Sequence, residues 1–182
     1  MKKADKNLVL KTKDLIICHT VSDDISVLME IENHPDNAIY IWHNTEEEHM
    51  EELKDPEVLT LTFKAKDDGR MVGYVICVMD YHSERFELKR WAFSPDEKRK
   101  GFGRQAIYAL MKYAFEDLDT NKFWLEAYPD NEAGNGLYVT SGLKLDGILR
   151  QNYKEERGIL DQLQYSMLKD EYFGLKKQGF FG

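Results

Sequence analysis

The feature that most constrains the fold is a basic, glycine-containing segment, residues 93–104, which joins a strand pattern to the strongest helical pattern in the chain. The helical pattern places apolar residues at three- and four-residue intervals, namely Ile107, Leu110, Met111, Ala114 and Leu118. Gly101 and Gly103 permit backbone angles that expose successive N–H groups, and a helix N-terminus adds about half a positive charge. The sequence therefore predicts a strand–loop–helix unit suited to an anion such as pyrophosphate.

The same segment concentrates positive charge in an acidic chain. Lys98, Arg99, Lys100 and Arg104 surround one turn, although the whole sequence has 25 Lys and Arg against 33 Asp and Glu, a net charge of -8. This balance argues against general nucleic-acid binding and fits a cationic substrate better. The alternative is a solvated basic turn whose glycines only shape the loop.

A dinucleotide-binding motif is a second alternative, because Gly101-x-Gly103-x-x-Ala106 matches its glycine spacing. In that motif the glycines follow the strand almost at once and open a parallel unit. Here seven residues separate Phe93 from Gly101, and the preceding strands form antiparallel patterns. Glu126 lies 25 residues after Gly101, a loose match to the acid that binds ribose. The context therefore opposes this interpretation.

The remaining patterns predict an α+β domain. We expect strands at residues 15–21, 58–66, 71–79, 86–93, 122–128, 143–153 and 160–168, and further helices at 23–31, 45–53 and 132–141. Asp23 is the expected N-cap of the first helix, and Asp68-Gly69 marks a tight hairpin. This order suits helices packed on a mixed, mostly antiparallel sheet in a single domain.

The glycine segment and a later block together resemble the GNAT N-acetyltransferases. The family signature Gln/Arg-x-x-Gly-x-Gly/Ala corresponds to Lys98-x-x-Gly101-x-Gly103, with lysine at a position where the family has Gln or Arg. The later pattern, Asn-x-x-Ala/Ser-x-x-x-Tyr-x-x-x-Gly-Phe, is matched by Asn131, Gly134, Tyr138, Gly142 and Leu143, with Gly134 and Leu143 imperfect. One helix and one strand separate the two blocks, as in the family.

This resemblance implies a GNAT-type fold over residues 14–170, with an N-terminal extension at 1–13 and a C-terminal tail at 171–182. Residues 86–91, 123–126 and 147–150 are similar to bacterial diamine or ribosomal-protein (RimJ/RimL-like) N-acetyltransferases. The implied co-substrate is acetyl-CoA, and the implied acceptor is a primary amine on a small molecule, a polyamine or a protein. A non-catalytic acyl-CoA-binding module is the alternative.

The resemblance also assigns proton transfer. A primary alkylammonium has a pKa of about 10.4, so a base must remove its proton before attack. Glu87 is the implied general base, acting directly or through water, and Tyr138 is the implied general acid toward the leaving thiolate. The alternatives are a surface glutamate paired with Lys89 or Arg90 and a tyrosine that only packs its ring.

Cofactor contacts follow from the same resemblance. The main chain around Trp91 and Phe93 would hold the acetyl carbonyl and pantetheine arm, where the family separates two parallel strands with a bulge. The loop residues that would bind pyrophosphate are Lys98, Arg99, Lys100, Gly101, Phe102, Gly103 and Arg104. Asn131 would hydrogen-bond the pantetheine arm or, alternatively, cap the following helix.

Other features lead to simpler expectations. The five histidines lack metal-ligand spacing, so we expect no metal, and Glu46, Glu47 and Glu48 read as a solvated helix face. Asp80, His82 and Glu84 could line an acceptor pocket. No run approaches the roughly 18 apolar residues of a membrane helix, and no signal peptide is evident, which predicts a cytoplasmic protein without membrane partners. The tail segment 179–182 could dock on the domain or across a homodimer, although termini are more often disordered.

Overall fold

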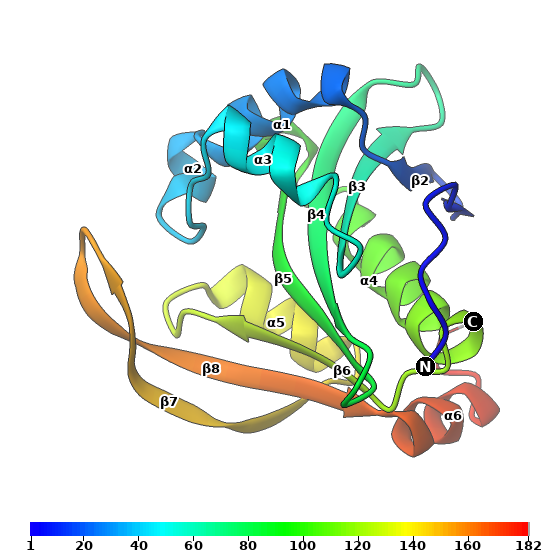
Figure 1. Ribbon diagram of the computed structural model, residues 1–182. Coiled ribbons are helices and arrows are strands. Elements are labelled where there is room, and N and C mark those ends of the chain that lie inside the picture. The colour runs from blue at the N-terminus through cyan, green and yellow to red at the C-terminus, as the bar shows by residue number, and fades with distance from the viewer. Residues whose placement is uncertain (182) are drawn as a thin grey trace.

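The computed structural model describes residues 1–181 and arranges them around one eight-stranded sheet (Figure 1). Neighbouring strands, in the order β1-β2-β3-β4-β5-β6-β8-β7, run antiparallel except for the parallel pair β5 and β6. The strands are β1 Val9–Lys11, β2 Leu15–His19, β3 Val58–Ala65, β4 Met71–Asp80, β5 Arg85–Phe93, β6 Lys122–Ala127, β7 Lys144–Glu155 and β8 Gly158–Leu168. The predicted α+β class is confirmed, and the sheet is not that of a parallel dinucleotide-binding fold.

Helices cover both faces of this sheet (Figure 1). One face carries α1 Ile25–Glu32, α2 Pro35–Ala38 and α3 Glu46–Glu52, and the other carries α4 Phe102–Lys112, α5 Glu132–Thr140 and α6 Lys169–Lys177. The apolar residues predicted for the central helix are all buried, and its last part, Tyr113–Asp117, is a π-helical turn. Among residues 1–181, no helix is long and apolar enough to cross a membrane.

The N-terminal third differs from the sequence prediction in two elements and one helix start. β1 and α2 were not predicted, because three mostly exposed residues and a four-residue helix are too short to show a period. Residues Ser22–Asp24 form a 3-10 turn, so α1 begins at Ile25 and Asp23 is not its N-cap. Thr45, in contrast, caps α3 through a capping box with Glu48.

The C-terminal tail is folded, so the expectation of disorder is wrong for its described part. Helix α6 follows β8 directly, and its Tyr172 stacks on Phe115 with ring centroids 4.8 Å apart. Phe181 packs against Tyr172 at 4.9 Å and against Tyr108 of α4 at 5.1 Å. Aromatic side chains therefore hold the tail on the body of the domain. Gly182 lies outside the described residues.

Strands β5 and β6 pair over only three residues. The register runs from Arg85 opposite Lys122 to Glu87 opposite Trp124, yet β5 continues to Phe93 and β6 to Ala127. Beyond Glu87 the two strands separate, and the β5 edge facing β6 has no strand partner among the described residues. The fold thus leaves an opening in the middle of the sheet.

A β-bulge lies just beyond the point where the strands separate. Cys77 of β4 pairs with Leu88 and Ile76 pairs with Arg90, so Lys89 is an extra residue in β5. The extra residue shifts the alternation of side chains by one. Leu88 and Trp91 consequently pack on the α4 face, whereas Arg90 points to the face covered by α1 and α3.

A buried ionic network joins α1 and α3 to the sheet behind this bulge. The Glu32 carboxylate accepts hydrogen bonds from Arg90 at 3.0 Å, Tyr74 at 2.9 Å and His49 at 2.9 Å, and Glu52 lies 3.3 Å from the other nitrogen of His49. Burial opposes the imidazolium, but the two carboxylates prevail and raise the pKa of His49 to about 9. His49 is therefore charged at neutral pH and balances two buried acids.

We predict that His49→Gln lowers the free energy of unfolding by about 3 kcal/mol near pH 6, because it removes the buried cation that Glu32 and Glu52 share. A raised histidine pKa stabilises the fold fully below the unfolded value of about 6.5, and this contribution disappears as the pH rises through about 9. Urea unfolding of both proteins across this range measures the difference. An equal loss at pH 6 and pH 10 would contradict a charged His49.

Candidate functional site

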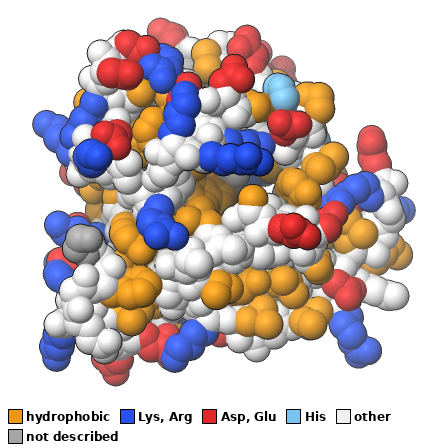
Figure 2. Space-filling view, turned by 180° about the vertical axis from the view of Figure 1, so that it is seen from behind, with side chains coloured by type: hydrophobic (Ala, Val, Ile, Leu, Met, Phe, Trp, Pro, Cys, Tyr) orange, Lys and Arg blue, Asp and Glu red, His pale blue; other side chains and the backbone are white. Residues whose placement is uncertain are grey.

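A groove of about 940 Å³ crosses the molecule where β5 and β6 separate. Figure 2 shows a hollow between two lobes, with hydrophobic side chains on its floor and Lys and Arg side chains at its margins. Its walls come from the segment after α2, from β5 and β6, from the start of α4, from α5 and from the β7–β8 hairpin. Segments far apart in the sequence therefore meet at one site.

The N-terminus of α4 forms one end of the groove. Gly101 is its N-cap with a φ of 82°, and Arg99 has a φ of 65°. Within residues 1–181 no side chain caps α4, so the N–H groups of its first turn remain available to a ligand. A Cβ at Gly103 would lie 3.0 Å from the Leu137 side chain, so glycine keeps this backbone open. The residues present fit the phosphate groups of acetyl-CoA.

Three of the four predicted loop cations line the groove, namely Lys98, Arg99 and Arg104. Burial lowers the pKa of Lys98, because desolvation disfavours its ammonium form. The fourth, Lys100, does not line the groove; its Nζ lies 2.9 Å from the carboxylate of Glu97. This end of the groove is therefore positively charged while the protein as a whole is acidic.

Tyr138 of α5 lies at the centre of the groove. Its hydroxyl oxygen accepts a hydrogen bond of 2.9 Å from the indole N–H of Trp91, and the two rings stack. Burial is the main cause that raises the pKa of Tyr138 to about 12, and the Trp91 bond opposes it. The phenol is thus protonated at neutral pH, and its oxygen uses a lone pair rather than its proton to bind Trp91. It is able to donate that proton to a ligand.

Glu87 and Glu126 line the groove on the side opposite α4, and Glu155 lines it at the β7–β8 hairpin. Glu87 is half-buried at the point where the strands separate, and burial followed by the charge of Glu126 raises its pKa. Burial also raises the pKa of Glu126, which receives long hydrogen bonds from Gln164 at 3.4 Å and Asn152 at 3.3 Å. Two carboxylates with raised pKa values can accept a proton or bind a cation.

Asn131 and Phe93 have internal partners in this structure. The Asn131 side chain accepts a hydrogen bond of 3.0 Å from the Gly134 amide, so it caps α5 while lining the groove. The Phe93 carbonyl accepts a hydrogen bond of 3.0 Å from Asn37. A Cβ at Gly134 would lie 2.8 Å from the Asn131 side chain, so Ala or Ser at this position would require the Asn131 side chain to shift.

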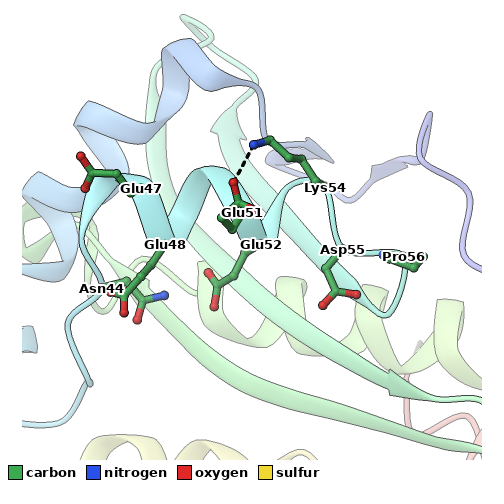
Figure 3. A pocket seen from close by; sticks show the side chains of 8 residues that line it. All are labelled: Asn44, Glu47, Glu48, Glu51, Glu52, Lys54, Asp55 and Pro56. Carbon is green, nitrogen blue, oxygen red and sulfur yellow. Dashed lines mark hydrogen bonds and ion pairs between the residues drawn. The ribbon is translucent and has the colours of Figure 1, made fainter.

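A second, more open depression of about 690 Å³ lies beside α3 (Figure 3). It is lined by Asn44, Glu47, Glu48, Glu51, Glu52, Lys54, Asp55 and Pro56. Glu47 and Glu48 are exposed, as expected for a solvated helix face, and Glu51 pairs with Lys54 at 2.7 Å. No residue predicted for catalysis or cofactor binding lines it. The described residues hold no group of three or more His, Cys, Asp or Glu side chains placed to bind a metal ion.

The turn between β4 and β5 also lies apart from the groove. Asp80 pairs with Arg85 at 2.7 Å, and Glu84 accepts a hydrogen bond of 3.1 Å from the Met1 amine. Asp80, His82 and Glu84 are all absent from the groove lining, so the expectation that they form an acceptor pocket is wrong. Their short sequence distance from Glu87 is misleading because β5 carries the chain away from the turn.

Sequence reasoning missed the roles of the Trp91 indole and of Glu126. The strand pattern places Trp124 and Glu126 on one face of β6, but it gives no register between β6 and β5. Only that register puts Glu126 on the same face as Glu87. The pairing of Trp91 with Tyr138 likewise depends on the bulge at Lys89, which the sequence does not locate.

Comparisons with known proteins agree with this geometry. The sequence pattern of the acetyltransferase (GNAT) family matches residues 25–143. The uncharacterized N-acetyltransferase YnaD of Bacillus subtilis is 19% identical over 107 residues, which cover 59% of this chain and 62% of YnaD. The match therefore spans less than two thirds of that relative.

Solved structures show the same fold. A probable acetyltransferase (GNAT family) from Chromobacterium violaceum superposes with a TM-score of 0.83 at 18% identity, covering 94% of this chain and 90% of that one. A mutant of the spermidine N-acetyltransferase SpeG from Vibrio cholerae superposes with a TM-score of 0.78 at 18% identity, covering 90% and 98%.

We predict that Glu126→Gln lowers the pKa of Glu87, because it removes the neighbouring negative charge without changing volume. Titration of the side-chain carboxyl carbons by NMR measures this shift. Glu132→Gln removes the same charge from the exposed face of α5 and serves as the control. An identical Glu87 pKa in both variants would mean that Glu87 and Glu126 do not interact.

Proposed function

The chain belongs to the acetyltransferase (GNAT) family, and we propose that it transfers the acetyl group of acetyl-CoA to a primary amine. One observation carries this proposal. A single groove runs from the positively charged N-terminus of α4, past Tyr138, to the carboxylates Glu87 and Glu126 on the opposite face of the sheet. It offers one end to an anionic co-substrate and the other to a cationic acceptor.

The first turn of α4 binds the pyrophosphate of acetyl-CoA in this proposal. Backbone N–H groups near Gly101 and Gly103 face the phosphates, and Lys98, Arg99 and Arg104 add charge from the loop and helix. Bound acetyl-CoA supplies the acetyl thioester. The unpaired edge of β5 beyond Glu87 offers backbone donors to the thioester carbonyl, where negative charge develops during transfer.

Proton transfer is assigned to the two groups that line the centre. Glu87 takes the proton from the ammonium group of the acceptor, and its raised pKa makes it a stronger base than an ordinary glutamate. The free amine then attacks the thioester carbonyl and forms a C–N bond. As the C–S bond breaks, the nitrogen loses its second proton to solvent, and solvent later returns a proton to Tyr138. Tyr138 donates its proton to the departing sulfur, since its hydroxyl oxygen is already oriented by Trp91. Glu126 lies near Glu87 and stabilises the acceptor's positive charge.

The acceptor in this proposal is a small primary amine, including diamines and polyamines. Glu87, Glu126 and Glu155 line the acceptor half of the groove together with the rings of Tyr40 and Trp42. Carboxylates and aromatic faces both attract ammonium groups. The likeness to a protein named as a spermidine N-acetyltransferase supports this class. An amine of a ribosomal protein, as in RimJ/RimL-like enzymes, is the alternative acceptor.

We predict that Glu87→Gln and Tyr138→Phe each lower the single-turnover rate of acetyl transfer by about a hundredfold or more, because each removes only the proton chemistry. The affinity for acetyl-CoA should change little. Glu87→Gln should also abolish the fall in rate at low pH that protonation of the base causes. A panel of amines, followed by release of the coenzyme A thiol, supplies the assay.

If the single-turnover rate falls less than about threefold in both Glu87→Gln and Tyr138→Phe, proton transfer belongs to water or to other groups. Wild-type protein that binds acetyl-CoA but acetylates no amine would instead favour the non-catalytic acyl-CoA-binding module. The two results are separable, because the first requires turnover and the second excludes it.

We predict that acetyl-CoA raises the melting temperature of the wild-type protein and has little effect on Gly103→Val. A ligand at a hundredfold excess over its Kd stabilises the folded state by about 2.7 kcal/mol. Valine at position 103 would press on Leu137 and cover the helix backbone. Circular dichroism of the unliganded variant checks its fold. NAD should shift neither protein, and a shift with NAD but not with acetyl-CoA would contradict the assignment of this groove.

A further inference from the structure

The tip of the β7–β8 hairpin is fastened across the acceptor end of the groove by Arg157. The guanidinium carbon lies 5.1 Å from the ring centre of Tyr128 and 5.7 Å from that of Tyr40, and one nitrogen pairs with the Asp130 carboxylate at 2.6 Å. Tyr128 and Asp130 lie between β6 and α5, whereas Tyr40 follows α2. One side chain at the hairpin turn thus joins three segments of the chain.

Neighbouring contacts close the same end. The Tyr128 hydroxyl donates a hydrogen bond of 2.5 Å to the Glu155 carboxylate, and the rings of Tyr153 and Trp42 meet edge to face at 6.0 Å. Tyr128, Glu155, Tyr153 and Trp42 all line the groove, so these contacts form its end wall. In Figure 1 the hairpin bends away from the rest of the sheet toward α2.

The middle of this hairpin is held by hydrogen bonds from the Gln151 amide to Asp161 at 2.8 Å and from Asn152 to Gln162 at 2.6 Å, so the tip beyond them is the part that Arg157 holds. Its ladder is irregular between Leu149 and Tyr153, Gln151 has a φ of 51°, and most side chains from residue 150 to 159 are exposed. The position of the tip therefore depends on the contacts of Arg157 and its neighbours. A segment with few buried contacts opens more easily than the core of the domain.

We propose that Arg157 is a specificity-determining residue, which locks the hairpin tip against Tyr40 and Tyr128 and so limits the length of acceptor that the groove admits. This inference rests on the proposed amine acetyltransferase function. Without the guanidinium, the tip is released from both rings and the wall opens. The freed rings of Tyr40 and Tyr128, together with Asp130, then present a second site for the distal ammonium of a long diamine.

The test compares Arg157→Ala with wild type on linear diamines of increasing length, from diaminopropane to diaminododecane, by release of the coenzyme A thiol. In Arg157→Ala the ratio of kcat/KM for the longest diamine to that for the shortest should rise by about tenfold or more. The KM for acetyl-CoA should stay unchanged, because its phosphates bind at the other end. Arg157→Lys keeps the charge but loses the planar group that stacks on the two rings. Its ratio of kcat/KM should therefore lie between those of wild type and Arg157→Ala.

Arg150→Ala is the matched control, since Arg150 is an exposed arginine of the same hairpin and its removal changes the net charge equally. In Arg150→Ala the ratio of kcat/KM for the longest diamine to that for the shortest should equal the wild-type ratio. An unchanged ratio in Arg157→Ala, or an equal rise in Arg150→Ala, would overturn the proposal.

Hydrogen exchange separates failure of this inference from failure of the proposed function. Amides of residues 151–160 should exchange about tenfold faster in Arg157→Ala than in wild type or Arg150→Ala, whether or not any amine is acetylated. If wild type acetylates no amine, the proposed function fails, and with it the role of Arg157 in acceptor choice. Unchanged exchange would show that Arg157 does not hold the tip.

Discussion

The site depends on the early end of pairing between β5 and β6. Two parallel strands that paired along their whole length would satisfy each other's backbone groups and close the sheet. Here pairing ends at Glu87 and Trp124, and the extra residue Lys89 turns β5 away. The opening lets one groove reach both faces of the sheet. It also leaves free backbone donors next to Tyr138, where a thioester carbonyl would lie in the proposed reaction.

The same opening separates opposite charges. The face with α4 presents Lys98, Arg99 and Arg104 around an uncapped helix N-terminus, and the other face presents Glu87 and Glu126. If the cations and carboxylates lay on one face they would pair with each other, as Lys100 does with Glu97. Among the described residues no ion pair joins Lys98, Arg99 or Arg104 to Glu87 or Glu126, although Asp36 and Glu97 line the groove beside the cations. This arrangement explains how an acidic protein can offer a cationic end to its groove.

The parts of the site that the sequence predicts are the local ones. The helix periodicity and the glycines fix α4 and its loop, because cap, loop and first turn are consecutive residues. The resemblance places Glu87 and Tyr138, and both line the groove. The pairings that depend on strand register and on the bulge, Glu87 with Glu126 and Trp91 with Tyr138, could not be predicted. The buried ionic network around Glu32 could not be predicted from the sequence for the same reason, because its members lie on four different elements.

That network adds to the pairing with β4 in holding the part of β5 that has no β6 partner. Arg90 directly precedes Trp91, and its guanidinium is held by Glu32 and by Asn44 at 3.2 Å. Glu32 is in turn fixed by His49 and Tyr74. A buried charge with several hydrogen-bonded partners tolerates little displacement, because each lost bond leaves a desolvated group behind. The helical face therefore restrains this part of β5 through side chains, in addition to the backbone pairing with β4. The β7–β8 tip is held instead by the partly exposed contacts of Arg157, so the groove has a buried centre and, in the proposal above, a wall that can open.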